Sequence, residues 1–442
     1  MNNEKKILVI AFKFPPYSGI GAKRWAKFSK YFAKKGYIIH VITVKWDQLG
    51  GKNWLDDVYH SNIIIHRIPS PFIHNIKYKS IIGYKKAIKH KNDQNKKIYE
   101  IGNIKNIFKK EIYKLMRWMG DFFFYVDEAQ YWHHFLIPYC KKIIKKEKIK
   151  NVIATGAPFM ANYWASRLKD EMSNINIIQD FRDPWMDNPF QYFITERSKK
   201  KALEFEKKTL SNFDALVTVT NGLKDILAKK AKSKNVIKVI PNGYDLDDFK
   251  DIENKKIKRK FEFIYAGGHM LGREEPLDAF LSSVLSISKE IPELKVNFYG
   301  HFPEDVKNKY RDLFENKILV NYPLVSYEEI QNKINESFAC LQLNAKVFPY
   351  LVSAKIYEYA ISKRPTLSIN YGGEIETMIN DHRIGISANG GDIGAINKAI
   401  FELYEIWKND PAYQIKQEGI EIYDYDKLTD EYISLLNSLK EK

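Results

Sequence analysis

The chain has 442 residues, of which 45% are hydrophobic, and it carries a formal net charge of +17. This length predicts two or three domains with sizeable cores, and the presence of only two cysteines argues against a disulfide-stabilised scaffold and fits a reducing cytosol. A membrane-spanning helix is not expected, because no run of eighteen or more uncharged apolar residues occurs. The excess positive charge predicts an anionic partner, which nucleic acid, an anionic membrane surface or a phosphorylated substrate would satisfy.

Short apolar segments alternate with helical segments through the first 249 residues. The first apolar segment leads into PPYSGIG without a small-residue cleavage pattern, so we interpret it as a buried strand and not as a signal peptide. Helices are expected around Trp25, Phe28 and Phe32 and over 161–172 and 196–210. This alternation is typical of a doubly wound α/β sheet. The strands are expected at 6–11, 38–44, 62–68, 151–156, 176–181, 215–220 and 236–243.

A second series of the same kind follows a polar, charged segment, which we interpret as a linker. Its strands are expected at 261–268, 295–300, 317–322, 338–343 and 365–370, with a helix from about Glu275. Two similar sheets predict two Rossmann-like halves, with ligands at the carboxyl ends of the strands between them. The predicted domains are 1–249, with a basic and aromatic insertion at 76–150, a linker at 250–259, a second domain at 260–405 and C-terminal helices at 406–442.

The stretch VSAKIYEYAISKRPTLSIN, residues 352–370, predicts a short helix that begins at Ser353 and is followed by a strand. The Ser353 hydroxyl is expected to cap the helix, and the free amides around Ser353 and Ala354 then form an anion site. Lys355 and Glu358 lie three residues apart on one helix face. A cation beside an acceptor for hydroxyl groups suits a ribose that carries a diphosphate. The alternative is a surface helix with an intrahelical ion pair.

A glycine-rich loop, GGHMLGREE, follows the first strand of the second series. Gly267 and Gly268 allow a close approach of the backbone, and the planar guanidinium of Arg273 can bind a diphosphate. A Walker loop is excluded, because no glycine-lysine-serine or glycine-lysine-threonine sequence ends the segment. The alternative is a solvated arginine beside two glutamates.

Two glycines, Gly19 and Gly21, follow the first strand of the chain and precede a helix. A dinucleotide fingerprint requires a third glycine at the position of Arg24, so a nicotinamide or flavin site is disfavoured. Two interpretations remain, which are a cleft loop whose backbone approaches a phosphate or sugar and an ordinary strand-to-helix turn.

The segment QDFRDPW places charged residues at the carboxyl end of a strand, where a cleft is expected. Asp183 can accept a hydroxyl proton or hold a sugar. In the alternative, an arginine–aspartate pair braces the loop before Pro184. The candidate cleft residues of this segment are Asp180, Arg182, Asp183 and Trp185.

Asp245 and Asp247 are spaced like the metal-binding aspartate pair of one class of sugar transferases. They follow Asn242 and Gly243, which form a strong turn signal. We therefore predict a structural turn without a metal. The histidines show no zinc-ligand spacing either.

Taken together, these segments resemble the GT-B glycosyltransferases, and in particular glycosyltransferase family four. Their order and spacing extend over nearly the whole chain. The matching pieces are FPPYSGIGAKRWAKFSKYFAKKGYIIHVIT, TGAPFMANYWASRLK, QDFRDPW, ALVTVTNGLKDIL, VIPNGYDLDDF, YAGGHMLGRE and SAKIYEYAISKRPTLSI.

The resemblance implies an α/β protein of the GT-B type, in which two Rossmann-like domains face a deep cleft. The N-terminal half would bind the acceptor and the C-terminal half the nucleotide-sugar, and the helices at 406–442 would cross back to the first domain. Glu358 matches the glutamate that holds the nucleotide ribose, and Arg273 matches the arginine that faces the diphosphate. The usual companion lysine of that loop is missing, and Lys355 is its expected replacement.

The sequence departs from the family pattern at Tyr350, eight positions before Glu358, where a second glutamate often contacts the donor sugar. Other groups then hold this sugar, including Tyr350 and backbone amides near Ser353, or the register of the loop differs. Retention of configuration is expected by analogy alone.

The expected chemistry is cleavage of the bond between the anomeric carbon and the phosphate. Arg273, Lys355 and helix amides would stabilise the charge that develops on the nucleotide diphosphate. Neither a metal nor a cofactor is required. In retaining members the leaving phosphate takes the acceptor proton, whereas Asp183 is the expected base if the enzyme inverts.

We therefore predict a glycosyltransferase of the cytoplasm or of the inner face of the cell membrane, which adds a sugar to a lipid-linked saccharide of a surface glycan such as O-antigen or capsule. The lysines and aromatic residues of 76–150 suit an anionic lipid surface; buried aromatics under a solvated basic face are the alternative. A nucleotide-sugar 2-epimerase is the alternative enzyme. A nucleic-acid-binding protein is disfavoured, because no RNA-recognition, helix-turn-helix or zinc pattern occurs.

Overall fold

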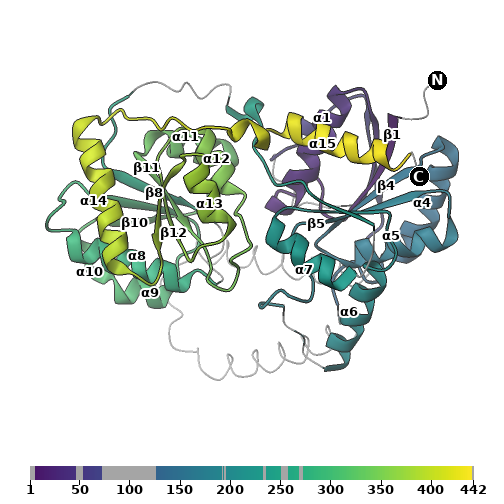
Figure 1. The fold of residues 1–442 in the computed structure, drawn as a ribbon, viewed down its shortest axis with the longest axis horizontal. Helices are drawn as coiled ribbons and strands as arrows, with labels where there is room; N and C mark the ends of the chain where they lie inside the picture. The colour runs from purple at the N-terminus through teal and green to yellow at the C-terminus, as the bar shows by residue number, and fades with distance from the viewer. Residues whose placement is uncertain are drawn as a thin grey trace, which may run out of the picture. The chain divides into compact units, whose positions relative to one another are not determined.

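The computed structural model describes residues 5–45, 53–71, 126–191, 193, 196–231, 235–249, 257–267 and 272–440. The chain forms two compact units (Figure 1). The first unit comprises Met1–Thr218, Ile226–Lys238 and Leu436–Lys442, and the second comprises Val219–Asp225 and Val239–Leu435. The domain boundaries inferred from the sequence stay predictions. Residues 76–125 of the predicted insertion and 250–256 of the predicted linker lie outside the described ranges.

The first unit contains a seven-stranded sheet in the order β3-β2-β1-β4-β5-β6-β7. The recorded pairings are parallel, and β1 is buried on both faces, as its continuous apolar run predicts. The order reverses between β1 and β4, which is the switch point of a doubly wound sheet. The strands are β1 (Lys6–Ala11), β2 (Ile38–Val44), β3 (Ile63–Ile68), β4 (Asn151–Gly156), β5 (Asn176–Phe181), β6 (Ala215–Thr218) and β7 (Val236–Val239).

Helices cover this sheet and bury apolar stripes against it. On α1 the predicted stripe is present, since Trp25, Phe28 and Phe32 are buried. Helix α1 contacts β2 and β3, and α5 contacts β1, β4 and β5. The helical elements are η2 (Ile20–Ala22), α1 (Lys23–Lys34), η3 (Asp56–Val58), α4 (His133–Glu147), α5 (Met160–Glu171), α6 (Glu196–Thr209) and α7 (Asn221–Ala231).

The second unit contains a six-stranded parallel sheet in the order β10-β9-β8-β11-β12-β13. Its switch point lies between β8 and β11. The sequence predicted five of these strands and missed β13, because GISAN contains a single large apolar residue. The strands are β8 (Glu262–Ala266), β9 (Lys295–Tyr299), β10 (Leu319–Tyr322), β11 (Ala339–Leu343), β12 (Thr366–Asn370) and β13 (Gly385–Asn389).

Alternate residues of β8 belong to two different apolar clusters, one on each face of this sheet. Phe263 and Tyr265 pack with α8 and α14, whereas Ile264 packs with α12 and α13. The helical elements are η4 (Leu246–Phe249), α8 (Glu274–Ile287), α9 (Glu304–Lys309), α10 (Arg311–Glu315), α11 (Tyr327–Glu336), α12 (Lys355–Ile361), α13 (Glu374–Asp381), α14 (Ile393–Asn409), η5 (Ile420–Tyr423) and α15 (Tyr425–Ser438).

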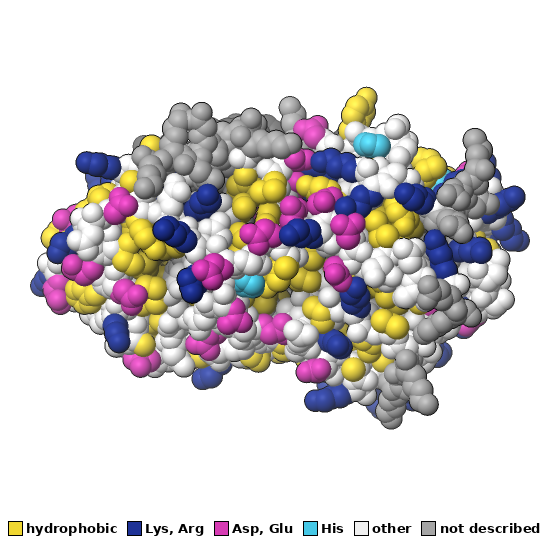
Figure 2. Space-filling model, turned by 45° about the horizontal axis from the view of Figure 1, so that its top comes forward, with side chains coloured by type: hydrophobic (Ala, Val, Ile, Leu, Met, Phe, Trp, Pro, Cys, Tyr) yellow, Lys and Arg dark blue, Asp and Glu magenta, His cyan; other side chains and the backbone are white. Residues whose placement is uncertain are grey.

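Charged side chains of both signs are mixed on the visible surface. Figure 2 shows Lys and Arg side chains interspersed with Asp and Glu over one face of the molecule. The net positive charge is therefore spread over this face and does not form a single patch. None of the helices among the described residues is both long enough and apolar enough to cross a membrane.

Two histidines of the first unit, the buried His40 and the half-buried His66, are in contact between β2 and β3. His40 Nδ1 lies 3.1 Å from His66 Nε2, and His66 Nδ1 lies 3.2 Å from the Tyr139 hydroxyl on α4. Burial and the neighbouring His66 lower the pKa of His40 from 6.5 to about 4. Glu147, Lys6 and Lys146 also act on His40, and only Glu147 opposes the shift.

We predict that acid weakens the first unit through His40. The unfolded chain takes up this proton at a higher pH than the folded chain, so the contribution to stability is complete above pH 6.5 and is lost between pH 6.5 and about 4. Denaturant unfolding, followed by tryptophan fluorescence, should show that the stability difference between wild type and His40→Gln falls with decreasing pH, by up to about 1.4 kcal/mol per pH unit. A difference that is constant over this range would contradict the assignment.

Candidate active site

Arg182 joins the two loops at the switch point of the first sheet. Its Nε donates to the Gly156 carbonyl oxygen at 2.9 Å, and its Nη1 donates to the Gly21 carbonyl oxygen at 3.1 Å. Gly156 ends β4, while Gly19 and Gly21 belong to the turn around η2 that follows β1. The glycine loop thus has the ordinary strand-to-helix turn as its local structure, fixed by an arginine from the end of β5.

Asp180 lies in a buried ion pair. Its side chain is fully buried, and its two oxygens lie 3.2 Å from Arg24 Nε and Nη2. The Trp25 indole nitrogen donates to the same carboxylate at 2.5 Å. Arg24 occupies the position where a dinucleotide fingerprint has glycine, and it joins α1 to β5 through this pair. The geometry of Asp180 therefore favours a structural role over contact with an acceptor.

Asp183 differs from Asp180 in having no polar partner among the described residues. It lies two residues beyond β5 and is half-buried, and its carboxylate makes no hydrogen bond or ion pair with any described residue. The bracing pair with Arg182 is absent from this part of the chain, since Arg182 donates to carbonyl oxygens. Trp185 is buried, and its ring stacks on Phe159 with centroids 5.3 Å apart. Of the two candidate aspartates, Asp183 is thus the one whose carboxylate is not engaged by described residues and could contact a ligand.

Arg273 crosses the switch point of the second sheet. It is the N-cap residue of α8, in the loop that follows β8, and its Nε donates to the Leu343 carbonyl oxygen at the end of β11, at 3.0 Å. Parallel α/β sheets bind ligands where the strand order reverses. Arg273 therefore places a guanidinium at the expected position. Gly268 lies outside the described residues.

Lys355 brings a second cation to this place from the start of α12. Its Nζ lies 3.8 Å from the centroid of the Tyr265 ring, and it forms no hydrogen bond or ion pair with the residues that the structure describes. Burial lowers the pKa of Lys355 well below its ordinary value of 10.5, and Arg273 lowers it further, whereas Glu358 opposes the shift. The predicted intrahelical ion pair is thus not formed, and a bound anion would favour the charged form of the amine.

Gly267 is required by this arrangement. A Cβ atom at this position would lie 2.9 Å from Lys355 Nζ and 2.7 Å from Tyr265 Cε1, so a side chain would displace the amine from the ring. Tyr359, one turn further along α12, accepts a hydrogen bond from the Ala266 amide at 3.2 Å and fixes the helix to the end of β8. The Gly267 backbone and the Lys355 amine are therefore held close together beside the switch point of the second sheet.

Glu358 follows Lys355 on α12, and its side chain is 7% exposed. The Tyr327 hydroxyl lies 2.9 Å from Glu358 Oε1. The sequence predicted Glu358 but gave no sign of Tyr327, which is the first residue of a separate helix, α11.

The predicted cap at Ser353 is wrong. Helix α12 begins at Lys355, and Ala354 is its N-cap residue with φ −58° and ψ −25° and no side-chain cap. The chain forms a tight turn before the helix, in which the Ile356 amide donates to the Ser353 carbonyl oxygen at 3.1 Å. The amides around Ser353 and Ala354 therefore do not form the capped site that the sequence predicted, and Arg273 and Lys355 remain the candidate groups for an anion.

Tyr350 and Asn344 lie in the loop between β11 and α12. Tyr350 packs against Gly222 of the same unit, where an added Cβ atom would lie 2.5 Å from Tyr350 Cβ. Asn344, directly after β11, is 3% exposed, and its side-chain amide makes no hydrogen bond to a described residue. The sequence analysis missed Asn344, although a polar residue that follows an apolar strand at the carboxyl edge is a usable signal.

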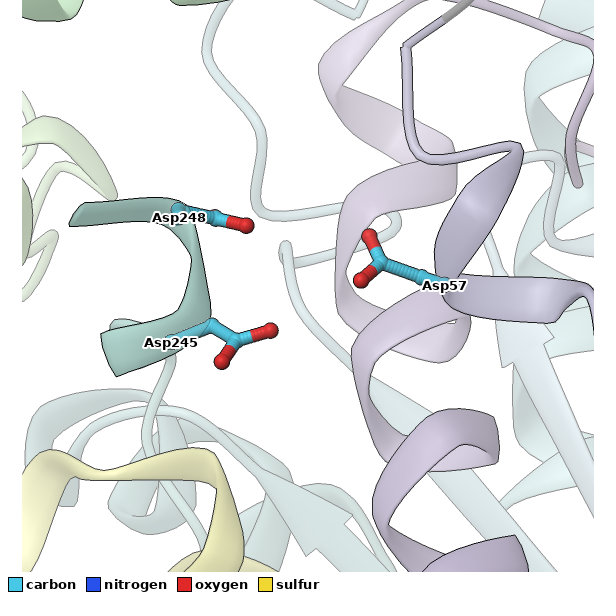
Figure 3. A group of neighbouring side chains, drawn as sticks. All are labelled: Asp57, Asp245 and Asp248. Carbon is cyan, nitrogen blue, oxygen red and sulfur yellow. The ribbon is translucent and has the colours of Figure 1, made fainter. Parts of the chain in front are cut away.

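The turn predicted at Asp245 is confirmed. Asp245 is buried, and its Oδ1 accepts a hydrogen bond from the Asp247 amide at 3.0 Å. Figure 3 shows Asp245 and Asp248 beside the short helix η4 and Asp57 on η3, an element of the first unit. Within the first unit Asp57 pairs with Lys27 at 2.8 Å.

The chain is similar to known proteins in part of its sequence and in its fold. Residues 108–248 match the sequence model of Glycosyltransferase Family 4. No curated protein matches the sequence. Among solved structures, sucrose-phosphate synthase from Thermosynechococcus elongatus has a TM-score of 0.63 at 12% identity and covers 99% of both chains.

Two further structures are similar over the whole chain. WaaG, described as a glycosyltransferase involved in lipopolysaccharide biosynthesis, has a TM-score of 0.56 at 11% identity, with 97% of this chain and 99% of that chain covered. A protein described as a UDP-N-acetylglucosamine 2-epimerase from Listeria monocytogenes has a TM-score of 0.55 at 12% identity, with 99% and 97% covered. At these identities the similarity establishes the fold, which is GT-B with two Rossmann-like domains.

The protein has the GT-B fold with two Rossmann-like domains, and its residues 108–248 resemble glycosyltransferase family 4. The fold class and the resemblance inferred from the sequence are thereby confirmed.

We predict that Asp180 and Asp183 respond differently to substitution. Asp180→Ala leaves the Arg24 guanidinium buried without its carboxylate, and this should lower the free energy of unfolding by about 3–5 kcal/mol. Asp183→Ala removes no polar contact, and its effect should stay within about 0.5 kcal/mol. Denaturant unfolding of both variants measures the difference, and equal losses would contradict the separation of roles.

Proposed function

We propose that the protein transfers a sugar from a nucleotide-diphosphate-sugar to a saccharide acceptor. The observation that carries this proposal is the amine of Lys355, which lies on the Tyr265 ring without an anionic partner among the described residues and beside Arg273. Two neighbouring cations at a switch point are suited to a diphosphate. Gly267 supports the assignment, because its lack of a side chain leaves the backbone accessible there.

The proposed chemistry follows from charge. Negative charge develops on the diphosphate as its bond to the anomeric carbon breaks, and Arg273 and Lys355 stabilise it. Glu358 accepts hydrogen bonds from the ribose hydroxyls, and Asn344 is suited to a hydroxyl of the donor sugar. Because protein cations supply the electrostatic stabilisation, we propose an enzyme that requires neither a metal nor a cofactor.

The acceptor proton has two possible destinations. In a retaining enzyme, which the family resemblance favours, the leaving phosphate takes it. In an inverting enzyme Asp183 is the base, a role that its lack of a polar partner among described residues supports.

A lipid-linked saccharide of a surface glycan is the proposed acceptor. The similarity to WaaG, whose description places it in lipopolysaccharide biosynthesis, supports this class. The net charge of +17 supports attraction to an anionic membrane surface. We accordingly propose a cytoplasmic enzyme at the inner face of the membrane, acting in the synthesis of O-antigen, capsule or a similar polymer.

A nucleotide-sugar 2-epimerase is the second candidate, because a protein described as such an epimerase shares the fold. The two activities are separable in one assay. An epimerase converts the nucleotide-sugar to its isomer without an acceptor, whereas a transferase releases nucleotide diphosphate in proportion to acceptor consumed.

We predict that Glu358→Ala weakens nucleotide binding by about 10- to 100-fold while the protein stays folded, because hydrogen bonds to a charged group contribute about 1.5–3 kcal/mol. A thermal-shift screen with uridine, guanosine and cytidine diphosphate-sugars identifies the ligand, and calorimetry measures its affinity. The matched control is Glu336→Ala, which removes a surface carboxylate paired with Lys333. Wild-type affinity in folded Glu358→Ala would exclude this ribose site.

We predict that Arg273→Ala lowers kcat on the order of 100-fold, because it removes stabilisation of the leaving diphosphate. Release of nucleotide diphosphate with saturating donor measures the effect. Arg311→Ala, on the exposed side of α10, is the control for loss of a positive charge. Unchanged turnover in Arg273→Ala would rule out the role.

A further inference from the structure

Tyr327 connects two carboxylates of the second unit. Its hydroxyl lies 2.9 Å from Glu358 Oε1 and 3.2 Å from Asp248 Oδ2. Its position is fixed by a cap, since the Ser326 side chain accepts a hydrogen bond from the Glu329 amide at 3.1 Å and begins α11 at Tyr327. The phenol therefore reaches Glu358 from an element that is independent of α12.

The phenol acts as a donor to these carboxylates. Burial, together with the negative charges of Glu358 and Asp248, raises the pKa of Tyr327 well above 10. A hydroxyl has one hydrogen, so it donates to one carboxylate at a time. The shorter distance identifies Glu358 as the acceptor.

A hydrogen bond from a fixed donor is needed to hold a glutamate carboxylate in one orientation. The terminal torsion of a glutamate side chain has broad minima, so α12 alone does not fix the plane of the Glu358 carboxylate. Three residues advance about 4.5 Å along a helix. A ribose linked to a diphosphate at Lys355 is therefore within reach of Glu358.

We propose that Tyr327 is a positioning residue, which orients the Glu358 carboxylate toward the two ribose hydroxyls of the nucleotide donor. This inference rests on the proposed function and adds a determinant of selectivity for ribose. Tyr327 does not touch the reacting atoms. Its loss should reduce the discrimination between ribose and dideoxyribose and leave the binding of the diphosphate intact.

The experiment compares two affinities in each variant. The probes are uridine, guanosine, cytidine and adenosine diphosphates and their 2′,3′-dideoxy counterparts, with the base that binds wild type most tightly chosen for calorimetry. Wild type should prefer the ribose form by about tenfold or more, which corresponds to about 1.4 kcal/mol. Tyr327→Phe should lower this ratio by at least threefold, with unchanged affinity for the dideoxy form. Tyr322→Phe, on the edge strand β10, is the matched control and should retain the wild-type ratio.

The Tyr327→Phe substitution is also tested in a second variant, Glu358→Gln, in case the single substitution impairs folding. In Glu358→Gln the carboxylate at position 358 is neutralised, so removal of the phenol leaves no bare charge at that position. Adding Tyr327→Phe to this variant should cause no further change in the ratio.

Each contrary outcome has a distinct meaning. A wild-type ratio in Tyr327→Phe, or an equal loss of affinity for both forms, overturns the positioning role. Equal binding of both forms by wild type also overturns it and leaves the diphosphate site standing. Failure of wild type to bind any of the nucleotides overturns the proposed function itself.

Discussion

The reversal of strand order in each parallel sheet is the constraint on which the site depends. The chain leaves β8 toward α8 on one face of the second sheet, and α12 follows β11 on the other face. The loops that follow these two strands therefore separate at the carboxyl edge, which is where parallel α/β sheets bind ligands. Arg273 links the first loop to the end of β11, and Arg182 makes the corresponding link between β1 and β4 in the first unit. The second unit adds the amine of Lys355.

Charged side chains that stabilise the fold form ion pairs within the protein, whereas the charged side chains proposed to bind a ligand do not. Arg24 and Asp180 are both buried and satisfy each other, so their desolvation is offset within the protein. Lys355 is held beside Arg273 with an aromatic ring as its partner, and burial and Arg273 lower its pKa more than Glu358 raises it. An anionic ligand would supply that compensation, and this supports the proposed binding site at Lys355.

The same contrast explains which residues the sequence placed correctly. It identified the aspartates of QDFRDPW as one group, because their spacing puts them together at the end of β5. It did not separate Asp180 from Asp183, since that depends on Arg24 and Trp25 arriving from α1. The prediction of a Ser353 cap was wrong for a local reason, because a tight turn precedes α12 and the helix therefore begins at Lys355.

The sequence by itself determined the two strand-and-helix series, the buried β1, the resemblance to the GT-B glycosyltransferases and the choice of Arg273, Lys355 and Glu358. These follow from local hydrophobic patterning and short motifs, which are properties of neighbouring residues. Only the tertiary structure decided that Lys355 lies on Tyr265, that Arg273 reaches Leu343 and that Tyr327 contacts Glu358. Each of these contacts joins separate elements of the fold, and the packing of the sheet and its helices, rather than the spacing along the chain, sets their distances.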